Sequence, residues 1–292
     1  MAWVRTVFVS ADGKPRSGWA IAVFVAVTLA AFLGPIVALT AVGGPITPGD
    51  RRAMLAAWIE VLGTLLATWV GCRMVRQPFG AAGFADPDPG RKALLGAAVT
   101  MVLVTVVSVV PYLLGKEGLG GPQVGARTLV SGGAFELALF APQSAAEEIF
   151  LRGFVLQQFR RGIGTVAAVL VTGVIFGVLH LFNANSSWIA AFNIALVGIW
   201  LGIVVVRTGS LWMTIGMHIA WNWFEGFVWG QPVSGYAMDV TLVHRTSGDS
   251  LFWTGGAFGP EASVLTALLL VALIGISLVA PLGRLAARTS PG

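Results

Sequence analysis

The sequence predicts an all-α, polytopic membrane protein, folded as a bundle of about eight transmembrane helices. Hydrophobic residues make up 56% of the chain and charged residues only 11%, whereas soluble domains carry about 25% charged residues. The uncharged apolar runs are far longer than the strands of a membrane barrel, which span about 10 residues each. Long runs of this kind cross a bilayer as helices, because a helix satisfies its own backbone hydrogen bonds.

The first part of the chain is predicted to contain three spans. The run from Trp19 to Val42 has no charge and no convincing small-residue cleavage site after it, so we expect an uncleaved span rather than a signal peptide. Glu60 interrupts the second span, and Pro111 lies near the end of the third. We therefore expect a cytoplasmic N-terminal segment at 1–18 and a region of three helices at 19–127, with spans at 19–42, 53–72 and 93–115.

The remaining helices fall into two further regions. Residues 128–230 are predicted to hold four helices, at 128–159, 165–182, 188–206 and 210–229, the first of which is long for a span and therefore expected to tilt, project or break. Residues 231–292 are predicted to hold an extracytoplasmic loop, the last helix and a C-terminal tail. Pro260 and Glu261 are typical of a first helical turn, so we expect the last helix to begin there and to end near Leu282.

The basic residues indicate how the chain crosses the membrane. With eight spans, 13 of the 18 lysines and arginines lie on the side that holds both termini. The positive-inside rule then places both termini in the cytoplasm. Arginine strongly outnumbers lysine, which is typical of GC-rich bacterial genomes, so we expect a multi-pass protein of the bacterial inner membrane. The net charge of +5 is scattered over short loops, which favours a lipid bilayer as partner and argues against nucleic acid.

Several hydrolase chemistries are excluded by what the sequence lacks. The single cysteine, Cys72, rules out an internal disulfide and a cysteine-based metal cluster. Neither the His-Glu-x-x-His pattern of common zinc proteases nor a Gly-x-Ser-x-Gly elbow occurs. An intramembrane aspartyl pair is also excluded, because every aspartate lies in a predicted loop, at positions 12, 50, 86, 88, 239 and 249.

The charges of Glu147, Glu148 and Arg152 lie inside a predicted span. Each such charge costs roughly 2.5–3.5 kcal/mol at a helix centre, so we expect a function for them. Glu148 and Arg152 are four residues apart and can form an ion pair along one face of the helix. Glu147 points about 100° away from Glu148, which leaves it as a free carboxylate suited to act as a general base.

Three further polar residues are predicted to reach the same depth. Counted at about 1.5 Å per residue from the cytoplasmic helix ends, Glu147, His180, His218 and Asn222 lie roughly 12–22 Å deep, near the middle of a hydrocarbon core about 30 Å thick. His218 and Asn222 are four apart and share a face. A carboxylate and a histidine that activate water, opposite two donors for an oxyanion, are the parts of a peptide-bond hydrolase.

Three motifs carry a resemblance to a known family. Glu-Glu-x-x-x-Arg at 147–152, Phe-x-x-x-His at 176–180 and His-x-x-x-Asn at 218–222 occur in order in consecutive predicted spans. The chain resembles the CPBP family of intramembrane proteases, the CAAX-prenyl-protease-like or Abi family, over about residues 135–230.

The resemblance implies an eight-helix bundle and endopeptidase activity on a membrane-associated or lipidated peptide or protein. Carried over to this chain, it implies that Glu147 and His180 activate water and that His218 and Asn222 stabilise the oxyanion. Glu148 and Arg152 would order the site as structural support.

The resemblance leaves two possibilities for metal dependence. The family is often called a metalloprotease family, and zinc could be held by Glu147, His180 and His218 with water as fourth ligand. Glu147 would then be used as a ligand, and the only nearby acid left as a base, Glu148, is expected to be paired with Arg152. We therefore favour a mechanism without a cofactor, with zinc as the alternative.

Two other classes of function stay open. A transporter could use Glu60, Glu147, Glu148 and the histidines as a proton relay, but repeated broken helices are not evident in the sequence. A membrane scaffold would carry a degraded site, whereas all three motifs are intact. Glu60 and Glu136 are expected to be packing groups, Ser144 and Asn193 interhelical hydrogen bonders, and Glu225 has no role in the resemblance.

Overall fold

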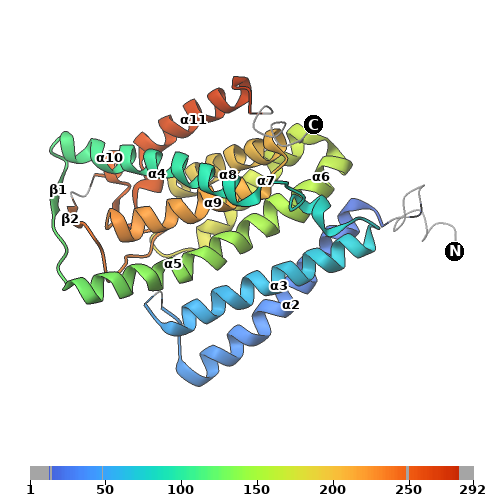
Figure 1. Cartoon of the computed structure of the whole chain (residues 1–292), viewed down its shortest axis with the longest axis horizontal. Helices are drawn as coiled ribbons and strands as arrows, with labels where there is room; N and C mark the ends of the chain where they lie inside the picture. The colour runs from blue at the N-terminus through green and yellow to red at the C-terminus, as the bar shows by residue number, and fades with distance from the viewer. Residues whose placement is uncertain (1–12, 14, 48, 248–249, 283–292) are drawn as a thin grey trace.

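The computed structural model describes residues 13, 15–47, 49–247 and 250–282, and it confirms the all-α class (Figure 1). The predicted segment 1–18 lies largely outside the described residues, as does the tail beyond 282. The longer helices are α2 (Ser17–Gly43), α3 (Arg51–Met74), α4 (Pro89–Leu113), α5 (Ala126–Glu148), α7 (Thr165–Leu179), α8 (Trp188–Thr208), α9 (Leu211–Trp223) and α11 (Val264–Val279). Shorter elements are η1 (Phe79–Ala82), η2 (Ile149–Val155), α6 (Leu156–Ile163), η3 (His180–Phe182), η4 (Phe224–Val228), α10 (Leu251–Thr254), η5 (Gly256–Phe258) and η6 (Pro260–Ala262).

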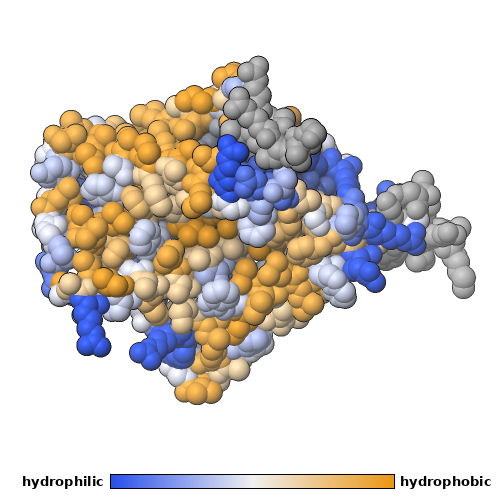
Figure 2. Space-filling view, viewed as in Figure 1, coloured by the Kyte–Doolittle hydropathy of each residue, from blue (hydrophilic) through white to orange (hydrophobic). Residues whose placement is uncertain are grey.

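The helices have the length and apolarity of membrane spans. Within the described residues, five segments are long and apolar enough to cross a bilayer, namely 17–43, 51–74, 89–113, 165–182 and 188–208, and α11 is a shorter apolar helix. Figure 2 shows hydrophobic residues over a broad part of the surface and hydrophilic residues gathered toward its ends. Large apolar side chains that face outward, such as Leu62 and Val102, suit contact with lipid rather than with water.

The bundle is organised around α5, which runs through the middle of the molecule in Figure 1. The α2–α3 hairpin packs on one side of α5, and α9 packs on the other. Helix α4 lies against α9, α7 against α8, and α11 against α8. The α7–α8 contact is close, because a Cβ on Gly177 would lie only 2.2 Å from the carbonyl oxygen of Ala191. Small residues allow such an approach between helices in a membrane.

The long helix predicted at 128–159 is broken at the charged motif. It consists of α5, the π-helical segment η2 and then α6. Gly153, inside η2, has a non-helical ψ of −106°. The helix predicted at 210–229 also changes, from α9 into the π-helical segment η4. Short π-helical turns inside helices are frequent at functional sites, and both of these follow directly after predicted site residues.

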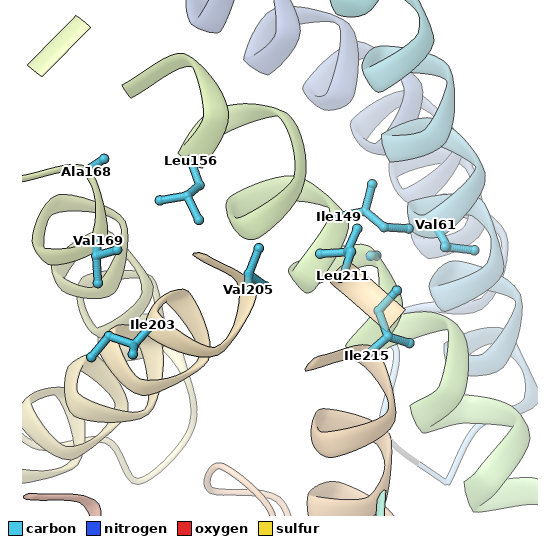
Figure 3. Close-up of a cluster of buried hydrophobic side chains, with 10 residues drawn as sticks. Val61, Ile149, Leu156, Ala168, Val169, Ile203, Val205, Leu211 and Ile215 are labelled. Atoms are coloured by element: carbon cyan, nitrogen blue, oxygen red, sulfur yellow. The ribbon is translucent and has the colours of Figure 1, made fainter. Parts of the chain in front are cut away.

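A buried hydrophobic cluster anchors η2. Ile149 of η2 and Leu156 of α6 pack with side chains from α3, α7, α8 and α9, as Figure 3 shows. The other labelled members are Val61, Ala168, Val169, Ile203, Val205, Leu211 and Ile215. Because this cluster draws on six helices besides η2, namely α3, α5, α6, α7, α8 and α9, it holds in place the segment that follows the two glutamates.

A two-stranded antiparallel sheet, which the sequence did not predict, joins distant loops. It consists of β1 (Glu117–Gly120) and β2 (His244–Ser247), with Glu117 opposite Ser247, and lies at the opposite end of the molecule from α6 in Figure 1. Arg245 forms an ion pair with Glu117 and donates a hydrogen bond of 2.9 Å to the carbonyl oxygen of Ser108. Burial lowers the pKa of Arg245 to about 10. The long loop predicted after residue 230 is therefore tied to the bundle.

The expected start of the last helix is wrong by about one turn. Pro260 and Glu261 lie in the 3-10 turn η6, and α11 begins only at Val264. Ser263 caps α11, since its Oγ accepts a hydrogen bond of 3.0 Å from the backbone N of Thr266. Glu261 is thus not a first-turn acid of the helix, and its side chain points into the protein, where it is 5% exposed.

Candidate active site

The predicted contact between Glu148 and Arg152 is confirmed. Arg152 Nη1 donates to Glu148 Oε1 across 2.9 Å, and both side chains are fully buried. The guanidinium also lies over the ring of Phe176, with its Cζ 4.1 Å from the ring centroid. Burial of a charged pair requires compensating contacts, and here they come from Phe176 of α7 and from His218 of α9.

His218 lies between the two glutamates. Its Nδ1 is 3.0 Å from Glu148 Oε1, and its Nε2 is 3.8 Å from Glu147 Oε2. Because an ionised carboxylate only accepts hydrogen bonds, Nδ1 carries the proton in the contact with Glu148. Glu148 therefore has a second partner that helical spacing alone did not predict, and it fixes both Arg152 and the His218 ring.

His180 closes the α7 side of the site. It occupies η3, directly after α7, and its Nδ1 lies 2.8 Å from the carbonyl oxygen of Phe176. A carbonyl cannot donate, so this nitrogen is the donor and Nε2 is the lone-pair nitrogen of the neutral ring. The rings of Phe176 and His180 meet edge to face at 4.6 Å. The Phe-x-x-x-His spacing thus has a direct physical role, because Phe176 supports both His180 and Arg152.

Asn222 connects α9 to α5. Its Nδ2 donates a hydrogen bond of 3.1 Å to Ser144 Oγ, so the prediction that Ser144 bonds between helices is confirmed. The amide has two N–H groups, and the second is not used in this contact. Asn222 is one turn beyond His218 on the same face of α9, as its spacing predicted.

One large cavity brings the four predicted catalytic residues together. It has a volume of about 620 Å³ and is lined by Glu147, His180, His218 and Asn222. Much of the remaining wall is apolar and comes from the α2–α3 hairpin, including Leu29, Phe32, Ile36, Ala53 and Ala57. Ligand cavities typically measure about 300–1,000 Å³ and are mostly apolar with a few convergent polar groups. The cavity fits this pattern, with its polar groups on one wall.

Comparisons with known proteins point to the same segment. Residues 130–224 match the family model described as type II CAAX prenyl endopeptidase Rce1-like. This segment is similar to that family. All three sequence motifs fall inside it, which confirms the predicted resemblance to CAAX-prenyl-protease-like proteins.

Similarity also extends beyond the Rce1-like segment. The chain is 27% identical over 191 residues to a protein of Bacillus subtilis (strain 168) named "Uncharacterized protein YyaK". The aligned part covers 63% of this chain and 64% of the relative, so the chain spans somewhat less than two thirds of that relative's length. No solved structure matches.

In the part of the chain that the structure describes, no group of three or more His, Cys, Asp or Glu side chains converges closely enough to hold a metal ion. Glu147, His180 and His218, the alternative zinc ligands, therefore do not fit a zinc site in this arrangement. No step of the chemistry proposed below passes through a metal.

Two residues beside the candidate site could not be recognised from the sequence motifs. Ser234 lines the large cavity, and Glu261 Oε2 accepts hydrogen bonds from the backbone N and the Oγ of Ser234, at 2.7 and 2.8 Å. Neither residue belongs to a motif, and they are 27 positions apart. The one available signal was an acidic residue in an apolar region, which was interpreted as a helix-dipole partner.

The other buried acids lie in different places. Glu60 was expected to be a packing group. Its side chain also lines the large cavity, from α3. Glu136 is 4% exposed and Glu225 fully buried, and neither is among the residues that line the cavity. The expected hydrogen bonding of Asn193 is found, but its partners precede α11. Its Nδ2 donates to the carbonyl oxygens of Glu261 and Ser263, at 2.8 and 2.9 Å.

Proposed function

We propose that this membrane protein is an intramembrane endopeptidase, CAAX-protease-like, that hydrolyses a peptide bond in a membrane-associated or lipidated peptide or protein. The observation that carries the proposal is the shared cavity, where Glu147, His180, His218 and Asn222 converge from three separate segments. The Rce1-like match over residues 130–224 supports the reaction class.

In this proposal Glu147 is the general base. Its side chain is 23% exposed and lines the large cavity, so a water molecule in the cavity can give a proton to the carboxylate. His180 presents Nε2 as a lone-pair nitrogen while Nδ1 is engaged by Phe176. A water held between the two groups would lose a proton as it attacks the carbonyl carbon of the substrate. That proton then passes to the leaving amine, which restores Glu147.

His218 and Asn222 are assigned to the oxyanion. Protonated at both nitrogens, His218 donates from Nδ1 to Glu148 and presents Nε2–H to the cavity. Asn222 uses one amide hydrogen on Ser144 and keeps the other for the substrate oxygen. Donors that are fixed before the reaction stabilise developing charge most effectively, because they need no reorganisation. Glu148 and Arg152 act as structural support, since they hold His218 in place.

The apolar wall suggests how a substrate lies. Leu29, Phe32 and Ile36 of α2 face the cavity opposite the polar wall. An apolar peptide segment or a lipid chain attached to it would pack there, with the scissile bond next to Glu147. The substrate is therefore proposed to reach the site from the bilayer, in a cell whose inner membrane holds this protein with both termini in the cytoplasm.

The test compares membrane peptidomes of three strains, namely wild type, a deletion strain, and the deletion strain complemented with Glu147→Ala. Peptides that appear only with the wild-type protein identify substrates and cleavage sites. A fourth strain that carries Glu136→Gln is the control, since it removes a buried carboxylate of α5 that does not line the cavity. If Glu147→Ala restored the wild-type peptide pattern, the proposal would be wrong.

A further inference from the structure

Glu261 lies next to the site on the side away from the large cavity. Its side chain is buried, and one carboxylate oxygen, Oε2, accepts both hydrogen bonds from Ser234. An ionised carboxylate has about four lone-pair acceptor sites, so the other oxygen keeps its full capacity. His180 and His218 are both within electrostatic range of this carboxylate.

The position of Glu261 is fixed from several directions. Asn193 of α8 holds the carbonyl oxygen of Glu261 at 2.8 Å. Its partner Ser234 lies in a tight turn, in which Asn183 Nδ2 donates to the Ser234 carbonyl oxygen at 3.1 Å, and the backbone N of Gly235 donates to the carbonyl oxygen of Phe258 at 2.8 Å. Burial raises the pKa of Glu261, whereas the hydrogen bonds from Ser234 and the two nearby histidines lower it and so favour the charged form.

A second, much smaller cavity is lined by Glu261 and by both histidines. Its volume is about 20 Å³, and its polar lining includes His180, His218, Asn222, Ser234, Glu261 and Thr100. A cavity needs about 10–15 Å³ to hold one water, which requires two to four polar partners. The large cavity shares four of these residues but not Glu261, so the small cavity lies behind the polar wall of the large one.

Building on the proposed function, we infer that the small cavity binds one water molecule, held by the Glu261 carboxylate, and that Glu261 is a positioning residue which acts on the two histidines through this water. A carboxylate near an imidazole stabilises the positive charge of the protonated ring, which is the form of His218 that the proposed oxyanion role requires. Here a water would transmit the interaction, which costs little compared with a direct hydrogen bond.

Other charged groups also lie near the two histidines. The large cavity adds Glu60 and Glu147, Glu148 contacts His218, and Arg152 stacks on the Phe176 ring that both histidines face. Glu225 is within electrostatic range of Glu261. Among these acids, Glu261 is the one that lines the small cavity, so substitutions at this position separate its effect from theirs.

The kinetic test uses matched substitutions in the full-length protein in proteoliposomes. Glu261→Gln keeps the side-chain size and an oxygen that can accept both Ser234 hydrogen bonds, but removes the charge. We expect kcat to fall about tenfold, which corresponds to about 1.4 kcal/mol, with KM and the melting temperature unchanged. Glu136→Gln is the control for loss of a buried acid and should change neither kcat nor KM.

The kinetic outcomes distinguish two roles of Glu261, namely positioning of the histidines and support of the turn that contains Ser234. If Glu261 only held Ser234 in place, Glu261→Gln would raise KM or lower the melting temperature with kcat unchanged, because Ser234 lines the large cavity. That result, or a kcat within twofold of wild type, would overturn the inference.

A measurement that does not depend on catalysis tests the water itself. A substrate-free wild-type structure at a resolution that reveals ordered water should show one molecule within about 3.2 Å of a Glu261 carboxylate oxygen and of Nε2 of His180 or His218, since both Nδ1 atoms are engaged by protein acceptors. An empty small cavity would refute the inference even if Glu147→Ala abolished hydrolysis. Conversely, if Glu147→Ala retained activity, the proposed function would fail while the water site would still be decided by the structure.

Discussion

Arg152 is the buried cation of the site, and its removal should lower the stability of the protein. In Arg152→Ala, Glu148 loses a partner at 2.9 Å in a fully buried position. Removal of one member of a buried ion pair typically costs about 3–5 kcal/mol, and the lost contact with the Phe176 ring adds to this. At about 2–4 °C per kcal/mol for domains of 150–250 residues, the melting temperature should fall by roughly 6–20 °C.

The measurement is thermal unfolding in detergent, followed by tryptophan fluorescence, for which the chain offers 11 tryptophans. The matched control is Arg161→Ala, an exposed arginine at the end of α6 that should shift stability by less than about 0.5 kcal/mol. The double variant Glu148→Gln/Arg152→Met should recover most of the stability, because apolar or neutral replacement of a whole buried pair is often neutral. It should not recover activity, since the charge next to His218 is gone.

One result would refute the reasoning. If Arg152→Ala abolished hydrolysis with an unchanged melting temperature, then Arg152 would act on the substrate and its assignment as structural support would be wrong. An unchanged temperature with full activity would show that Glu148 does not need a cation at all.

Three further predictions concern catalysis, topology and metal. Glu147→Gln should lower the rate of peptide hydrolysis in proteoliposomes by about 10²–10⁴ without a change in melting temperature, because Glu147 Oε2 has no hydrogen-bond partner among the described residues; a variant that retained activity would exclude Glu147 as the base. A cysteine at exposed Ala81, between α3 and α4, in a chain without Cys72 should resist impermeant thiol reagents added to intact cells, and labelling from outside would reverse the orientation. The same holds for a cysteine at Ser290, which lies outside the described residues. Purified active protein should contain no stoichiometric zinc by elemental analysis and should survive prolonged chelation, whereas zinc that restored a chelated, inactive enzyme would overturn the glutamate mechanism.

Much of the fold was predictable because hydrocarbon imposes a simple rule on sequence. A long apolar run without charge, such as the one after Trp19, has few options other than a spanning helix. The same rule made Glu147, Glu148 and Arg152 conspicuous, since buried charge inside a span is costly. Helical spacing then gave the ion pair of Glu148 and Arg152, because both residues lie on one helix and the geometry is local.

Contacts between helices were harder to predict from the sequence. The spacing within α5 indicates which way Glu148 points relative to Glu147, but not which neighbouring helix it meets. The contact between Glu148 and His218 links residues 70 positions apart and depends on the packing of α5 against α9. Depth along each helix could be counted from the sequence, whereas rotation about each helix axis depends on side-chain packing across the whole bundle.

Irregular segments were the least predictable. The strands β1 and β2 have four residues each, and β1 reads Glu-Gly-Leu-Gly, which has little intrinsic preference for a strand. Their pairing is supported by the ion pair of Glu117 and Arg245, which no local pattern reveals. Glu261 was misassigned for a related reason, because an acid after proline has a local explanation at a helix start, while its actual partner, Ser234, lies in another loop.

The orientation of the two histidines does not by itself decide between metal and glutamate chemistry. Each ring has its Nδ1 engaged by an acceptor, a carbonyl oxygen for His180 and a carboxylate for His218, and zinc-binding histidines are held in the same way. What distinguishes the two mechanisms is a third donor at metal distance. Glu147 Oε2 is one candidate, at 3.8 Å from His218 Nε2, but no group of three His, Cys, Asp or Glu side chains converges among the described residues. In the proposed mechanism the Glu147 carboxylate therefore shares a water with His180, which is the arrangement that a general base requires.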